Sequence, residues 1–117
     1  MDGMKSIYTN EHASAEVVVS KALNGMDGVL ELINLKTDDG FQKQGFGTQL
    51  LLEICNEADS NGIVLMLHPR KDWLINWYKR FNFKRIQSSP IILMARSPRI
   101  SVKFTEMAIA THKATHG

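Results

Sequence analysis

Two glycines stand directly before a predicted helix, in the run QKQGFG at residues 42–47. Gly45 and Gly47 permit backbone conformations and close approaches that side chains forbid. Apolar residues then recur at the spacing of one helix face, at Phe46, Leu50, Ile54 and Ala58. The first amides of a helix lack intrahelical acceptors and lie at the positive end of its dipole, so this segment can bind a pyrophosphate. The pattern therefore predicts a nucleotide-type ligand.

The glycine run differs from the two most familiar phosphate-binding motifs. It lacks the Gly-Lys-Ser/Thr ending of a P-loop and the third glycine of a dinucleotide-binding fold. Gln42, Gly45 and Gly47 instead form Gln-x-x-Gly-x-Gly, which resembles the acetyl-CoA pyrophosphate loop of the GNAT N-acetyltransferases. A tight turn without a ligand is the alternative for such glycines taken alone.

A second motif, WYKRFNF at residues 77–83, resembles the Phe-Tyr-x-x-x-Gly-Phe segment that closes the last helix of GNAT enzymes. Asn82 stands where the family usually has glycine, and asparagine is enriched in the left-handed conformation expected there. Both motifs occur in the family's order with one strand between them. Residues 15–96 are therefore similar to a GNAT domain.

Hydrophobic patterns and turn residues predict the elements that carry these motifs. Strands are expected at 15–23, 29–37, 63–67, 83–87 and 91–95, and residues 1–13 are either a short edge strand or a frayed arm. Helices are expected from the glycine run to Asn61-Gly62, and from Asp72 as N-cap to Asn82 in the left-handed conformation. Five residues are expected on one side of the second helix: Trp73, Leu74, Trp77, Tyr78 and Phe81.

This order predicts an α+β fold of α/β-like, three-layer character, with a mixed β-sheet flanked by helices. A strand, a helix and another strand in succession favour at least one parallel pair. A length of 117 residues suits one domain over residues 1–117, with its core at about 15–96 and an extension at 97–117. Residues 107–110 are either a short packing element or disordered.

The resemblance implies acetyl-CoA as acetyl donor. By matching position, the backbone at Leu35, Lys36 and Thr37 would hold the pantetheine arm. The pyrophosphate would be bound by Gln42, Lys43, Gln44, Gly45, Phe46, Gly47 and Thr48. Tyr78 matches the tyrosine that protonates the departing CoA thiolate, for which a neutral phenol is a suitable acid. A core tyrosine with a satisfied hydroxyl is the alternative.

Acetylation of an amine also requires loss of a proton, because only the neutral amine attacks a thioester. A lysine-like amine of pKa about 10.4 is neutral about once in 2,500 molecules at pH 7, a cost near 4.6 kcal/mol. Glu31 stands where histone-acetyltransferase-like family members have a catalytic glutamate, and is the predicted base. The alternative is that Glu31 points to solvent. His68, after the next strand, is the second candidate.

The resemblance is incomplete at two places. Family members often have an asparagine near the start of the last helix that contacts CoA, where this chain has Lys71 or Asp72. No pair of helices is predicted before Glu31, so the acceptor groove is expected to be open. An open groove favours a protein lysine or N-terminus over a small amine. The alternative is a non-catalytic module of GNAT fold that binds CoA or a partner protein.

Composition limits the remaining functional classes. A net charge of +2 and the absence of a basic patch with interleaved aromatics give no strong nucleic-acid signal. Cys55 alone cannot form an internal disulfide and is expected as a packed thiol. Asp38, Asp39 and Glu53 lack the spacing of a metal site, so no metal is expected. No membrane span or signal peptide is predicted, so a cytoplasmic location is expected. A homodimer is left open.

Overall fold

The computed structural model describes residues 4–19 and 28–99 of the chain. Its elements occur in the predicted order, with the N-terminal segment forming a short strand. They are β1 (Ile7–Thr9), β2 (Ala13–Val19), β3 (Val29–Thr37), α1 (Phe46–Asn61), β4 (Val64–Leu67), α2 (Asp72–Lys79), β5 (Lys84–Gln87) and β6 (Leu93–Arg96). Residues 20–27, which include the predicted turn, and residues 107–110 lie outside the described residues.

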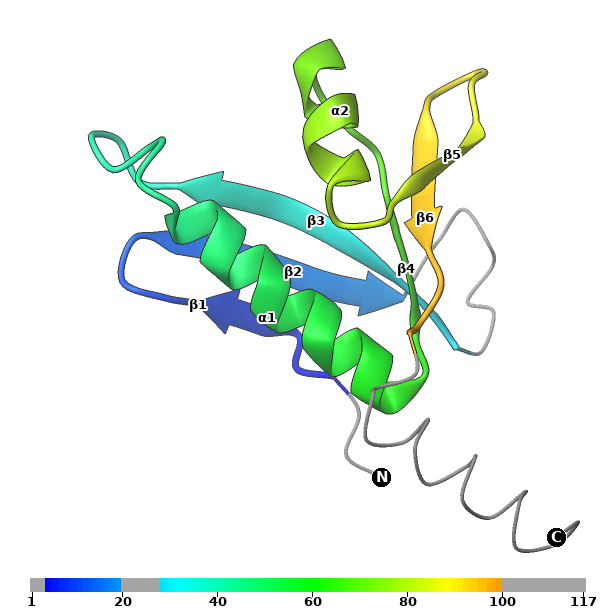
Figure 1. The fold of residues 1–117 in the computed structure, drawn as a ribbon, viewed down its shortest axis with the longest axis horizontal. Coiled ribbons are helices and arrows are strands. Elements are labelled where there is room, and N and C mark those ends of the chain that lie inside the picture. Colours follow the sequence, from blue (N-terminus) through cyan, green and yellow to red (C-terminus); the bar gives the residue numbers. More distant parts are fainter. Residues whose placement is uncertain (1–3, 20–27, 100–117) are drawn as a thin grey trace, which may run out of the picture.

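The strands form one mixed sheet in the order β1-β2-β3-β4-β6-β5, as Figure 1 shows. β3 and β4 are parallel, as the strand–helix–strand pattern predicted, and the other pairs are antiparallel. β6 lies between β4 and β5, so the last of the described strands occupies an interior position. The α+β mixed-sheet class predicted from the sequence is confirmed.

Helix α1 begins and ends at glycines in the left-handed conformation. Gly45 is its N-cap with φ 91°, and Gly62 is its C-cap with φ 66°. The predicted apolar stripe is buried, at Leu50, Leu51, Ile54, Cys55 and Ala58. Burial also raises the pKa of the Cys55 thiol to about 11, which keeps it protonated. Cys55 is thus a packed thiol, as predicted.

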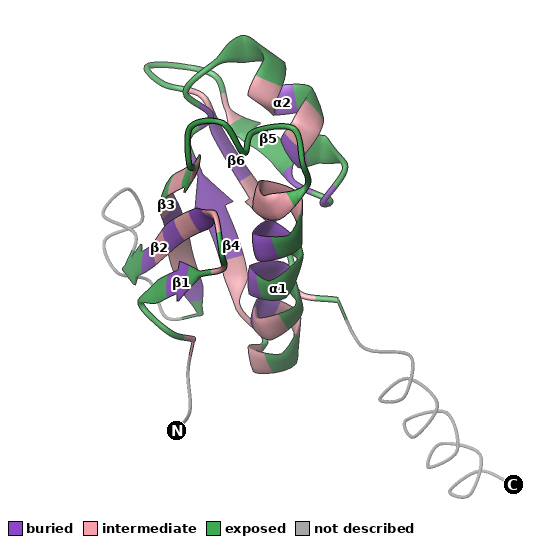
Figure 2. Ribbon diagram, turned by 90° about the vertical axis from the view of Figure 1, so that its left-hand side faces the viewer, coloured by how far each residue is buried: buried purple, intermediate pink, exposed green. Residues whose placement is uncertain are grey.

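Both described helices lie on one face of the sheet, as Figure 2 shows from the side. The main core fills the space between them and the sheet, and includes Leu32, Leu65, Met94 and Tyr78. A smaller apolar cluster of Val29, Met66 and Leu93 lies on the opposite face. The described part therefore has two layers, one sheet and one layer of helices, and not the three-layer character that was predicted.

Helix α2 differs from its prediction at its start. Lys71 is the N-cap, in extended conformation and without a side-chain cap, and Asp72 is already helical. Trp73 is 65% exposed, whereas Ile75 and Tyr78 are buried. With eight residues, α2 makes little more than two turns, so only a narrow stripe meets the core. Phe81 packs from the turn beyond the helix.

The end of the α2 segment follows the prediction. Asn82 has φ 71°, the left-handed conformation that its position in the motif required. β5 and β6, the strands predicted at 83–87 and 91–95, pair antiparallel but begin at Lys84 and Leu93, later than expected. Within residues 4–19 and 28–99, neither helix is long and apolar enough to cross a membrane.

Candidate functional site

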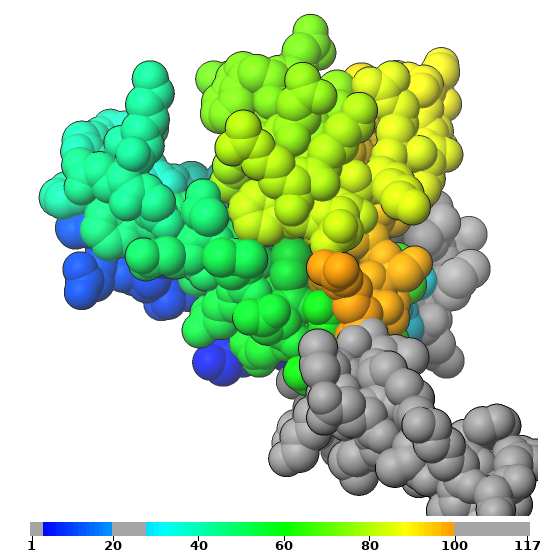
Figure 3. Space-filling view, in the orientation of Figure 1, coloured from blue at the N-terminus to red at the C-terminus, as the bar shows by residue number. Residues whose placement is uncertain are grey.

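A cleft opens where β3 and β4 diverge. The two strands pair only between Val29–Glu31 and Val64–Met66, after which β3 continues alone to Thr37. The resulting space has a volume of about 150 Å³. Its walls come from β3, the end of β4 and α2, and consist of Glu31, Leu32, Ile33, Asn34, Leu35, Leu67, His68, Arg70, Leu74 and Tyr78. In Figure 3, a notch separates the loop before α1 from α2.

The wall formed by β3 is interrupted by a bulge. The register with β2 shifts between Ser14 and Glu16, and Asn34 has φ 54°. The Asn34 side-chain nitrogen donates to Glu16 Oε2 at 2.6 Å. A bulged residue is left without a ladder partner, and β4 no longer pairs with β3 at this level. Backbone groups of β3 are therefore available to an extended, amide-containing ligand in the cleft.

The glycine loop meets the end of β3 at the start of α1. The first helical hydrogen bond runs from the amide of Gln49 to the carbonyl of Gly45, at 2.9 Å. The N-cap has no side-chain hydrogen bond, and the first turn has no acidic residue. The three amides at residues 46–48 thus have no intrahelical acceptor and lie at the positive end of the helix dipole. This geometry fits a pyrophosphate, whose oxygens would supply the missing acceptors.

Gly47 packs closely against β3. A Cβ atom at this position would lie 3.1 Å from Thr37 Oγ1. Such a contact is tighter than normal van der Waals distance, so a side chain here would displace its neighbour. The requirement for glycine at this point of the motif therefore comes from close packing, whereas at Gly45 it comes from the left-handed backbone.

The turn between β1 and β2 supports the glycine loop. Asn10 Nδ2 donates to the Phe46 carbonyl at 2.9 Å, while Asn10 Oδ1 accepts from the amides of His12 and Ala13. The His12 ring stacks on Phe41 with centroids 3.4 Å apart, and its Nδ1 lies 3.5 Å from Asp38 Oδ2. Sequence reasoning missed this support. Asn10 before a strand does indicate a local turn, but not its contact with α1.

Tyr78 reaches the cleft from α2. It is 7% exposed, and burial raises the pKa of its phenol to about 12. Its hydroxyl makes no hydrogen bond with any described residue. The Tyr8 hydroxyl, in contrast, accepts from the Lys5 amide at 3.0 Å. Tyr78 therefore presents a neutral, unused donor at neutral pH.

Glu31 and His68 line the same cleft as Tyr78. Glu31 is half-buried, between Val18 and Met66 in the sheet. His68 is exposed, and its Nδ1 lies 2.7 Å from the Ile92 carbonyl. A neutral His68 would donate from Nδ1 there, which leaves Nε2 as an acceptor.

The predicted site residues therefore fall into two adjoining groups. Glu31, Leu35, His68 and Tyr78 line the cleft. Thr37, two residues beyond Leu35 on β3, lies against Gly47 of the glycine loop of residues 42–48. Lys36 is exposed and does not line the cleft. Among the described residues, no three His, Cys, Asp or Glu side chains gather as a metal site would require.

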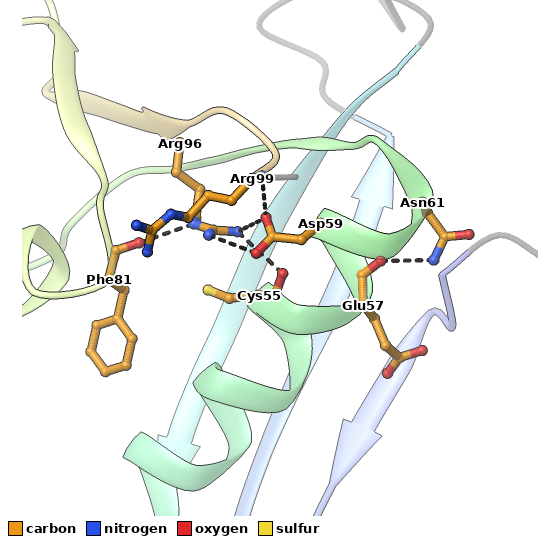
Figure 4. A network of polar contacts seen from close by, with 7 residues as sticks. All are labelled: Cys55, Glu57, Asp59, Asn61, Phe81, Arg96 and Arg99. Atoms are coloured by element: carbon orange, nitrogen blue, oxygen red, sulfur yellow. Dashed lines mark hydrogen bonds and ion pairs between the residues drawn. The ribbon is translucent and has the colours of Figure 1, made fainter. Parts of the chain in front are cut away.

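A buried arginine fixes α2 relative to α1. Arg96 is 3% exposed, and its guanidinium donates to the carbonyls of Phe81 at 2.9 Å and Cys55 at 3.2 Å. It also pairs with Asp59, with Nη1 3.0 Å from Oδ1. Figure 4 shows Arg96 between the last turns of α1 and the turn after α2. Sequence reasoning missed this role, because the partners of Arg96 lie far from it along the chain.

No protein-family profile matches this chain, and no curated protein matches it in sequence. Solved structures do match its fold. The ribosomal-protein-S18-alanine N-acetyltransferase of Escherichia coli aligns with TM-score 0.60 and 20% identity, over 77% of this chain and 63% of that chain. The Bacillus subtilis N-acetyltransferase YlbP, in complex with coenzyme A, has TM-score 0.55, 23% identity and coverages of 74% and 60%.

The Escherichia coli GNAT family N-acetyltransferase YhbS, in complex with CoA, aligns with TM-score 0.57 and 14% identity, over 76% of this chain and 55% of that chain. The chain spans about three fifths of the length of the solved structures that it matches. At these identities the likeness concerns the fold. The chain thus has the fold of the GNAT N-acetyltransferases, as the two sequence motifs indicated.

Proposed function

We propose that this protein is an acetyl-CoA-dependent N-acetyltransferase that acetylates a primary amine. The observation that carries the proposal is the cleft between β3 and β4, which Tyr78 and Glu31 both line, with the uncapped start of α1 packed against the end of β3 at Thr37. Structural neighbours crystallised with CoA support the choice of ligand. Acetyl-CoA would supply an acetyl group already activated as a thioester.

The chain offers matching groups for each part of such a donor. The amides at residues 46–48 would bind the pyrophosphate, and Lys43 and Gln44 lie in the preceding turn. The unpaired backbone of β3 around Leu35 would hydrogen-bond the pantetheine amides. Gly47 keeps the loop close to Thr37, so the two groups of donors form one continuous path.

Tyr78 would donate a hydrogen bond to the sulfur as the carbon–sulfur bond breaks and negative charge develops there. With its pKa raised to about 12, the phenol remains protonated throughout the neutral range. Full transfer of its proton to a thiolate of ordinary pKa, near 8.5, would be uphill by about 5 kcal/mol. The main contribution of Tyr78 is therefore a hydrogen bond that stabilises the developing thiolate. Its proton moves toward the sulfur only as negative charge builds up there.

Glu31 would accept the proton that the amine loses, directly or through a water molecule. Side chains alternate along β3, so Glu31 lies opposite to Leu32, whose side chain is in the core beneath the helices. Tyr78 enters the cleft from the helical face. The amine and the donor would thus approach from opposite faces of the sheet.

We further propose that the acceptor amine belongs to a protein, as a lysine or an N-terminus. Among the described residues, no helix covers the sheet face that bears Glu31 (Figure 2). A polypeptide could therefore reach the cleft along this face without displacing any described element. A neighbour of this fold acts on the alanine of a ribosomal protein, which is consistent with a protein acceptor.

The donor is tested by thermal unfolding with acetyl-CoA. Ligand that binds only the folded state adds RT ln(1 + [L]/Kd), about 2.7 kcal/mol at one hundred times Kd. Gly47→Glu would place a carboxylate against the pyrophosphate and should abolish the stabilisation. Leu52→Glu adds the same charge to the exposed side of α1 and should retain it. A response that survives in Gly47→Glu would remove the loop from the binding site.

The reaction is tested by CoA release in the presence of amines and peptides, with mass spectrometry of the acceptors. The enzyme should release CoA faster with peptide acceptors than with small amines whose amino groups have a similar pKa. Acetyl-CoA stabilisation without acetylation of any acceptor would instead indicate the alternative function, a CoA-binding module. Faster turnover of small amines would contradict the protein acceptor and leave the enzyme class intact.

A further inference from the structure

Contrary to the expectation that the chain has no basic patch with interleaved aromatics, positive charge is concentrated in one short part of it. Residues 70–85 contain one carboxylate, Asp72, and six basic side chains, at Arg70, Lys71, Lys79, Arg80, Lys84 and Arg85. This segment has a net charge of +5 in a chain whose total is +2, so the rest of the chain is negative overall. All six basic residues are exposed. The protein is therefore electrostatically polarised, although its net charge is small.

The fold gathers three of these cations around the end of α2 and the start of β5. Lys79 and Arg80 end the helix, and the turn that follows is closed by a hydrogen bond from the Asn82 amide to the Lys79 carbonyl. In β5, Arg85 pairs with Met94 of the main core and so lies on the same face of the sheet as α2, whereas Lys84 pairs with Ala95 of the opposite face. Figure 3 shows α2 and β5 side by side. We call Lys79, Arg80 and Arg85, together with Trp73, the α2–β5 surface.

The charges of the α2–β5 surface are uncompensated within the described residues. The two ion pairs found there lie elsewhere, between His12 and Asp38 and between Arg96 and Asp59. Three neighbouring cations without acidic partners repel one another, and an anionic partner would relieve that repulsion. The surface therefore favours an anion larger than a single ion.

Trp73 adds an aromatic contact to this surface. Its side chain is 65% exposed, although tryptophan is usually well buried. It lies seven residues before Arg80 on the exposed stripe of α2, a spacing that places both on the same side of the helix. Cations beside an exposed indole suit a polyanion whose units also have flat, stackable faces.

We propose that the α2–β5 surface binds single-stranded nucleic acid, with its cations on the phosphates and Trp73 stacked on a base. A single strand fits better than a duplex, because paired bases do not expose their faces to an indole. An acidic peptide could match the cations but would give Trp73 no equivalent partner. This binding is independent of acetyl transfer.

The test measures binding of a fluorescently labelled, twelve-nucleotide single-stranded RNA over a salt series. Lys79→Gln/Arg80→Gln removes two charges from the surface, and Arg85→Gln removes one. Lys5→Gln/Arg99→Gln removes two exposed charges elsewhere and is the matched control. The double surface variant should lower the slope of log K against log salt by about 1.4 and Arg85→Gln by about 0.7, at about 0.7 per lost phosphate contact, and the double variant should bind at least tenfold more weakly. The control should remain within twofold of wild type.

Trp73→Ala should weaken RNA binding about fivefold or more, and Trp73→Phe, which keeps a ring, should restore most of it. Circular dichroism of every variant checks folding. Equal losses in the surface and control variants would overturn the proposal, because net charge alone would explain them. Equal affinity for a polyglutamate peptide would overturn it in favour of an acidic protein. Displacement of the RNA by CoA would assign these cations to the nucleotide of the acetyl donor instead.

Discussion

Asn10 donates a hydrogen bond to the carbonyl of Phe46 at 2.9 Å, although 36 residues separate them in the sequence. Phe46 is the first residue of α1, where the amides for a pyrophosphate begin. The turn between β1 and β2 therefore holds the start of the helix from outside the glycine motif. Rigid support of this kind lowers the entropy lost when a ligand binds, because the amides are already oriented.

Asn10→Ala should raise the KM for acetyl-CoA several-fold while kcat stays within about twofold, because only donor binding depends on the loop. Loss of three hydrogen bonds should also lower the free energy of unfolding by about 1–3 kcal/mol. Asn56→Ala, on the exposed side of α1, is the control for removal of an asparagine. An Asn10→Ala enzyme with unchanged KM would mean that the loop keeps its geometry without this bond.

Tyr78→Phe tests the leaving-group role against the other tyrosine of the chain, Tyr8. We expect Tyr78→Phe to lower kcat about 10²-fold or more with little change in acetyl-CoA affinity, because the phenol acts only as charge develops. Tyr8→Phe loses the hydrogen bond from the Lys5 amide and should reduce stability while kcat is retained. Unchanged kcat in Tyr78→Phe would remove Tyr78 from the mechanism.

The raised pKa of Tyr78 has a consequence for stability at high pH. Its phenol ionises at about pH 12 in the folded protein and near pH 10 in the unfolded chain. The contribution of the buried, neutral phenol to the free energy of unfolding is therefore fully present below pH 10 and is lost as pH rises toward 12. Between those values, wild type should lose more free energy of unfolding than Tyr78→Phe does, as measured by urea unfolding. Parallel pH curves for the two proteins would contradict the assigned burial effect.

Arg96→Met should destabilise the protein by about 3 kcal/mol, because two backbone carbonyls and the Asp59 carboxylate would lose their buried partner. Arg96→Lys should be intermediate, since an ammonium cannot reach three acceptors in one plane. Arg99→Ala is the control, because only the backbone amide of Arg99 contacts Asp59. Urea unfolding gives the free energies, and alkylation of the buried Cys55 thiol reports local opening.

Sequence reasoning succeeded where the determinants are local. The apolar period of α1 and its flanking glycines require no knowledge of the rest of the chain, and the observed helix has the predicted bounds. The same holds for Asn82, whose left-handed conformation follows from its place between a helix and a strand. Glu31 and Tyr78, which the resemblance to the GNAT enzymes singled out, both line one cleft.

Features that depend on contacts between distant parts of the chain were not predicted. The insertion of β6 between β4 and β5 depends on which edge the hairpin joins, and periodicity carries no information on that choice. Arg96 was expected only as a strand-end residue, yet its guanidinium binds three residues from two segments, α1 and the turn after α2. Trp73 was expected on the same side of the second helix as Tyr78, yet it is exposed. Apolar spacing alone does not show which turn of a short helix lies beyond the edge of the core.

The final prediction concerns Glu31 as the base. If Glu31 takes the amine proton, Glu31→Gln should keep the fold and acetyl-CoA binding but slow acetylation, most strongly at low pH. As pH approaches the pKa of the acceptor amine, the neutral amine becomes plentiful and the variant should recover toward wild type. A residue that only attracts a cationic amine would behave differently, because its loss raises the acceptor KM without this recovery of kcat.

His68→Gln is the companion variant, since His68 lines the same cleft and its Nε2 could accept the proton. It should retain the wild-type pH profile if Glu31 is the base, and Glu31→Asp should restore part of the activity at low pH. The rates are measured from pH 6 to 10 with the peptide acceptor identified by mass spectrometry. A wild-type profile for Glu31→Gln together with a low-pH defect in His68→Gln would transfer the role to His68. Wild-type profiles for both variants would mean that water removes the proton, because no other base candidate lines the cleft among the described residues.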